Sequence, residues 1–135
     1  MANALYDLGR KAFMDGGIAI LTDNIKVVLV DTATYTVNLA TDAFLSDILI
    51  AERVATSGNL TTKTSTAGVF DAADVVFSAV TGDPSEALVI YRDSGVEGTS
   101  ELLAYIDTAG GLPITPNGGD ITVTWDAGAD KIFKL

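Results

Sequence analysis

The sequence predicts a mainly β protein, an antiparallel β-sandwich (jelly-roll-like) with one short N-terminal helix. Short runs of apolar, mostly β-branched residues recur about every 8 to 15 residues, as in all-β sandwiches and barrels. Clusters of Gly, Pro, Asn and Asp separate these runs and are typical of turns. The 135 residues are the usual size of one domain, so we expect residues 1–135 to form a single β-sandwich domain.

One helix is predicted, over residues 2–15 within the N-terminal segment 1–17. Leu5, Leu8 and Phe13 recur there at helical spacing, and charged residues occupy the other side. A Gly-Gly pair follows and should end the helix, because glycine adopts the left-handed conformation that a helix C-terminus needs. We expect this helix to pack on the protein's own sheet. Docking of its apolar face on a partner is the alternative.

The first half of the chain predicts one buried strand followed by a long irregular excursion. Residues 25–31 (IKVVLVD) are apolar and β-branched over a run too short for a helix. In residues 32–50, Thr first alternates with Ala, Tyr and Val, and a short helical turn holding Phe44 and Leu45 is expected after it. Long ordered loops often carry function, so this excursion is a candidate partner surface.

Residues 53–69 predict a polar hairpin. Two strands, the second rich in Thr, flank a Ser57-Gly58-Asn59 turn, and the faces of this segment are rather polar. A strand that is polar on both faces suits the edge of a sheet or the surface, and we place the hairpin there.

The second half of the chain predicts five strands. Residues 75–80 (VVFSAV) and 86–92 (EALVIYR) are apolar, and the latter run predicts a central strand. Residues 101–107 (ELLAYID) are apolar on both faces, as expected between two layers. Residues 120–125 (DITVTW) alternate, and residues 131–135 (KIFKL) close the sheet. We expect these last two strands to lie in one half of the sandwich and 86–92 and 101–107 in the other.

The composition excludes several functions. The chain has neither Cys nor His, so Ser-His-Asp and Cys-His catalysis and the usual transition-metal sites are excluded. Eight basic against 18 acidic residues give a formal net charge of −10. This balance disfavours binding to nucleic-acid phosphates and to anionic membrane surfaces. A pair of carboxylates for glycoside hydrolysis stays open, because any two of the 18 acidic residues could meet in space, but none has a local signature. We therefore expect no enzyme, no cofactor, no nucleic-acid partner and no membrane partner.

Calcium is the one ion that the remaining side chains suit, because Asp and carbonyl oxygens are its ligands. The candidate pairs are Asp71 with Asp74 and Asp126 with Asp130, and neither has the spacing of a known calcium loop. Asp in turns also bonds its own backbone, so we interpret all four as turn residues and predict no metal site. Trp125 ends an alternating strand and is interpreted as a core residue rather than a ligand platform.

Almost the whole chain resembles a family of small structural proteins of tailed bacteriophages. The resemblance is carried by the stretches ALYDLGRKAF, IKVVLVDTATYTVNLATDAFLSDI, ERVATSG, EALVIYRDSG and LLAYIDTAGGLPITPNGGDITVTWDAGADKIFKL. It contains no catalytic motif. It implies a virion component, made in the host cytoplasm and placed on the capsid surface as a decoration (cement) protein. A tail, baseplate or fibre component that contacts the host surface is the alternative.

The resemblance also implies partners, namely the major capsid protein and further copies of the chain in a homo-oligomer, either a dimer or a trimer. The expected contact surfaces are the helix, the excursion over residues 32–50 and the edge strands. Apolar side chains of the helix and the excursion are the candidate partner-contact residues: Leu5, Leu8, Phe13, Tyr35, Phe44 and Leu45.

Overall fold

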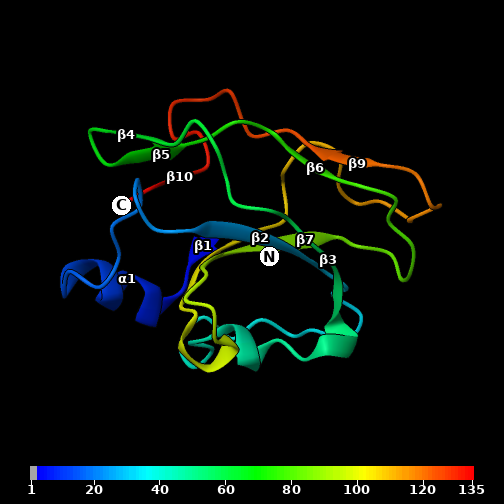
Figure 1. Cartoon of the computed structure of the whole chain (residues 1–135), viewed down its shortest axis with the longest axis horizontal. Coiled ribbons are helices and arrows are strands. Elements are labelled where there is room, and N and C mark those ends of the chain that lie inside the picture. Colours follow the sequence, from blue (N-terminus) through cyan, green and yellow to red (C-terminus); the bar gives the residue numbers. More distant parts are fainter. Residues whose placement is uncertain (1–2) are drawn as a thin grey trace.

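The computed structural model describes residues 3–135, which form three layers with an antiparallel sheet in the middle (Figure 1). The sheet has five strands in the order β1-β8-β7-β2-β3. In that order their bounds are Ala4–Leu5, Leu102–Ile106, Ala87–Arg92, Ile25–Val30 and Arg53–Thr56. All its neighbouring strands pair antiparallel. Strand β7 lies at the centre, as the sequence predicted for residues 86–92.

A second β layer covers one face of this sheet (Figure 1). It consists of a three-stranded sheet, β10-β5-β4, and a two-stranded sheet, β6-β9. The bounds of β4, β5, β6, β9 and β10 are Thr64–Thr66, Val69–Asp71, Val75–Phe77, Ile121–Val123 and Phe133–Lys134. The predicted mainly β class with antiparallel sheets and one helix near the N-terminus is thereby confirmed. Strands β9 and β10 lie across from β7 and β8, also as predicted.

A third layer without strands covers the other face of the sheet, at the bottom of Figure 1. It is built from residues 31–52 and 93–101 and contains three 3-10 helices. These are η1 (Leu45–Asp47), η2 (Ile50–Glu52) and η3 (Glu97–Thr99). The excursion predicted over residues 32–50 is therefore a structural layer rather than a free loop.

Each face of the central sheet carries its own hydrophobic core. On β2, Val27 and Leu29 enter the core beneath the second β layer, whereas Val28 and Val30 enter the core beneath the third layer. All four side chains are fully buried. Burying one such side chain stabilises a fold by about 1.5–3 kcal/mol, so a sheet that is apolar on both faces requires both covers.

The helix α1 spans Asp7–Met14 and is shorter than predicted. Residues 1–2, which include the predicted first residue of the helix, lie outside the described residues, and Ala4–Leu5 forms strand β1 on the edge of β8. The predicted start was wrong because pairing with the sheet edge overrides helix propensity there. The predicted end is confirmed, since Gly16 follows the helix with φ +76°. Helix α1 packs on the protein's own sheet, which was the favoured expectation.

The predicted hairpin over residues 53–69 does not form. Strand β3 pairs with β2 in the central sheet, and β4 pairs with β5 in the second layer. The 57–60 connection crosses from one layer to the other, where the backbone N–H of Leu60 donates to the carbonyl of Ile25 (2.7 Å). Both strands lie at sheet edges, so the edge position was predicted correctly and the pairing was not.

Helix α1 approaches β8 closely at Gly9, and this contact yields a prediction. A Cβ on Gly9 would lie 2.4 Å from the carbonyl oxygen of Leu102. We expect Gly9→Ala to lower the free energy of unfolding by about 1–3 kcal/mol, because backbone atoms cannot move aside as a flexible side chain can. Urea unfolding followed by the fluorescence of the single Trp gives the value.

Gly98 provides the matched control, because a Cβ there meets no atom within 4 Å. Gly98→Ala should change the unfolding free energy by no more than about 0.5 kcal/mol. Equal losses in the two variants would contradict the close approach of the helix.

Candidate functional site

The six predicted contact residues occupy different environments. Leu5, Tyr35 and Leu45 are buried in the two cores, and Phe13 and Phe44 are half-buried. Leu8 alone is exposed. The protein's own packing therefore uses Leu5, Tyr35 and Leu45, which corrects the expectation that these side chains face a partner.

A buried chain of hydroxyls attaches the excursion to the central sheet. The Tyr6 and Tyr35 hydroxyl oxygens lie 2.9 Å apart, and the Tyr35 hydroxyl donates to Oδ2 of Asp42 (2.8 Å). The same carboxylate oxygen accepts the backbone N–H of Asn38 (3.0 Å). Tyr6 immediately precedes α1, so this chain of bonds joins the helix, the sheet and the third layer.

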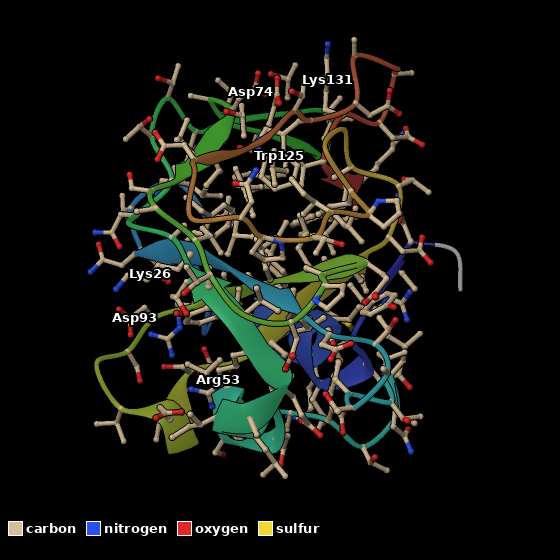
Figure 2. The ribbon with its side chains drawn as sticks, turned by 90° about the vertical axis from the view of Figure 1, so that its right-hand side faces the viewer. Lys26, Arg53, Asp74, Asp93, Trp125 and Lys131 are labelled. Carbon is tan, nitrogen blue, oxygen red and sulfur yellow. The ribbon has the colours of Figure 1, made fainter. Side chains whose placement is uncertain are left out.

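Arg53 holds the 3-10 helices together. From the edge strand β3, its guanidinium donates to the carbonyl oxygens of Leu45 and Ile48 and forms an ion pair with Glu97 (2.5 Å). Figure 2 shows Arg53 lying between the two segments that carry these partners. The η1 and η3 helices also pack against each other. Residues 45–52 and 96–99 therefore form one connected surface.

That surface exposes apolar side chains. Leu49, Ile50 and Val96 are 62%, 77% and 62% exposed. The carboxylates of the same turns are Asp47, Glu52 and Glu97. We call these six residues the η2–η3 surface. Its apolar members are not evident from the sequence, because a run such as Ile48-Leu49-Ile50 in a segment without helix or strand period does not reveal which side chains point outward.

A second apolar feature lies at the end of the molecule that carries the helix. Side chains from α1, the segment after it and strands β5 and β10 line a groove of about 210 Å³. The rings of Phe13 and Phe133 are 6.2 Å apart, and those of Phe70 and Phe133 are 5.2 Å apart. Leu135 lines the groove and is largely exposed, as is Met14 beside Phe13 in the chain. We call this feature the aromatic groove. It is the place where predicted contact residue Phe13 reaches the surface.

Two of the four acidic turn residues bond the backbone as predicted, since Asp71 and Asp126 accept backbone N–H groups within their own turns. Asp74 instead accepts the backbone N–H of Trp125, 51 residues away along the chain (3.1 Å). Among residues 3–135, no group of three or more acidic side chains could hold a metal ion. Trp125 is buried between the layers beside Asp74 and donates to the carbonyl of Ala73, which confirms the core interpretation (Figure 2).

All four tyrosines of the chain lie in the core beneath the third layer. Burial raises the pKa of Tyr6, Tyr35 and Tyr105 above the ordinary value of 10. Burial, together with the nearby Asp93 carboxylate, raises the pKa of Tyr91 to about 12. The folded protein therefore holds these four side chains as neutral phenols.

No protein-family model matches the chain, and no curated protein matches it. Within the described part of the chain, none of the helices is long and apolar enough to cross a membrane.

The raised tyrosine pKa values predict an alkaline unfolding transition. The folded state binds the tyrosine hydroxyl protons more tightly than the unfolded state does, so their contribution to stability is complete below pH 10. It is lost as the pH rises from 10 towards the folded pKa values, about 12 for Tyr91. We expect tyrosinate absorbance to stay constant from neutral to mildly alkaline pH and then to rise together with the change in Trp fluorescence. Tyrosinate forming well before the fluorescence changes would contradict burial of the four rings.

Proposed function

We propose that this protein is a non-enzymatic structural component of a tailed-phage virion. In this proposal it is a capsid decoration (cement) protein that binds the outer surface of the major capsid protein lattice and stabilises the head. The resemblance of the sequence to small phage structural proteins is the first support. The second support is physical, because such a protein has to be a rigid body that offers apolar contact area.

One structural observation carries the proposal. The central sheet is packed on both faces, yet among residues 3–135 half of the eight exposed large apolar side chains lie at two features: Leu49, Ile50 and Val96 on the η2–η3 surface and Leu135 at the aromatic groove. Scattered single apolar residues are ordinary on a protein surface, whereas local groups of them typically mark contacts with other proteins. Two separate groups suit a protein that binds both a lattice and further copies of itself.

A tail, baseplate or fibre role is supported less well. Recognition of a host glycan usually places aromatic rings on the surface, beside carboxylates. The four tyrosines and Trp125 are all buried here. We therefore favour the head over the tail.

The expected oligomer is a dimer or trimer formed through the aromatic groove. Charges near α1 are paired within the chain, Arg10 with Asp7 and Lys11 with Asp15, so two copies can approach there without strong repulsion. In sedimentation velocity the protein should be larger than its 14.0 kDa monomer. Leu135→Ser should shift it towards the monomer, and Val76→Ser, in the two-stranded sheet, should not. A monomeric wild type at micromolar concentration would contradict the oligomer while leaving capsid binding open.

The location of the protein in the virion tests the main proposal. Cryo-electron microscopy of the virus that encodes this chain should show density of this three-layer fold outside the capsid shell, repeated over the lattice. Virions lacking the protein should lose that density and release their genome at a lower temperature. Density on the tail would contradict the decoration role and favour the alternative.

A further inference from the structure

The apolar side chains of the η2–η3 surface are held in place before any partner arrives. The carboxylate of Glu52 accepts the backbone N–H of Leu49 (2.8 Å), and the backbone N–H of Glu52 donates to the carbonyl of Leu49 (2.9 Å). Arg53 fixes the adjacent carbonyl of Ile48. Ile50 therefore projects from a turn whose ends, Leu49 and Glu52, are hydrogen-bonded to each other. Binding through Ile50 then costs little ordering of the backbone.

The charge around these side chains has one sign. Residues 31–52 contain four acidic residues and residues 93–101 contain three, and neither segment contains Lys or Arg. Neighbouring cations neutralise the three in 93–101 through ion pairs: Lys26 with Asp93, Arg53 with Glu97 and Arg92 with Glu101.

The four carboxylates of residues 31–52 have no such cation. Within residues 3–135 they accept hydrogen bonds from neutral donors and form no ion pair: Asp31, Asp42, Asp47 and Glu52. The layer that carries Ile50 is therefore negative, with exposed apolar side chains projecting from it.

This combination identifies the kind of partner. A second copy of the chain, docked through the same surface, would bring two sets of unpaired carboxylates together, and like charges across an interface are costly. A basic protein surface with apolar recesses would satisfy both the carboxylates and the exposed side chains. We propose that the η2–η3 surface is the face that docks on the capsid shell, with Ile50, Leu49 and Val96 entering apolar recesses of a basic patch. This inference rests on the proposed function.

Binding to purified empty heads that lack the protein tests the inference. Ile50→Ser and Val96→Ser should each weaken binding about tenfold or more, as expected for apolar anchors at the centre of an interface. Val76→Ser is the matched control, because Val76 is 53% exposed but lies on β6 in the opposite layer. It should bind as the wild type does. Circular dichroism of each variant verifies that the fold is retained.

A charge pair tests the sign of the partner surface. Asp47→Asn and Asp126→Asn both keep an oxygen that can accept the backbone N–H groups now bonded to the carboxylate. Asp47→Asn should weaken binding several-fold and reduce its dependence on salt between about 50 and about 500 mM. Asp126→Asn, in the opposite layer, should do neither.

The outcomes separate the two proposals. If wild-type protein binds heads, and Val76→Ser weakens binding while Ile50→Ser does not, the docking face is wrong but the decoration role stands. If Asp47→Asn strengthens binding, the partner surface is acidic and the inference is overturned. If wild-type protein does not bind heads at all, the proposed function and the docking face both fall.

Discussion

The structure depends on one antiparallel pair, β2 with β7, whose side chains are buried on both faces. The two strands pair from Ile25 opposite Arg92 to Val30 opposite Ala87. A sheet built around such a pair leaves apolar area open to water on each side until both sides are covered. The chain covers one side with small sheets and the other with 3-10 helices and loops. The architecture follows from that requirement.

Polar bonds make the cover of 3-10 helices and loops possible. A layer without strands or long helices must satisfy its backbone groups individually. The Asp42 carboxylate, bonded to the Tyr35 hydroxyl, accepts the backbone N–H of Asn38. The guanidinium of Arg53 donates to the carbonyls of Leu45 and Ile48. Each such bond contributes only about 0.5–1.5 kcal/mol net, but a buried partner left unpaired costs more. The layer is therefore fixed in place, which gives its exposed side chains a defined position.

The sequence predicted what depends on local pattern. Continuous apolar runs identified β2, β7 and β8, and alternation identified β9. It failed where the outcome depends on distant partners. Ala4 and Leu5 fit a helix but pair with β8 instead, and the polar strands β3 and β4 join different sheets. The excursion was recognised as irregular, yet nothing local shows that Tyr35 and Leu45 turn inward while Leu49 and Ile50 turn outward. Packing on the sheet and the bonds to Arg53 decide which side chains turn inward. The sequence does not show that Arg53 lies beside them.

The central sheet also separates the two cores from each other. Alternate side chains of β2 belong to different cores, so residues of one layer pack against the sheet and not against the opposite layer. Substitutions at sites without shared contacts usually act independently on stability. The layer that carries the η2–η3 surface can thus accumulate changes during evolution without disturbing the packing on the other side. A protein built this way can follow a changing binding partner with one face while the other keeps the fold intact.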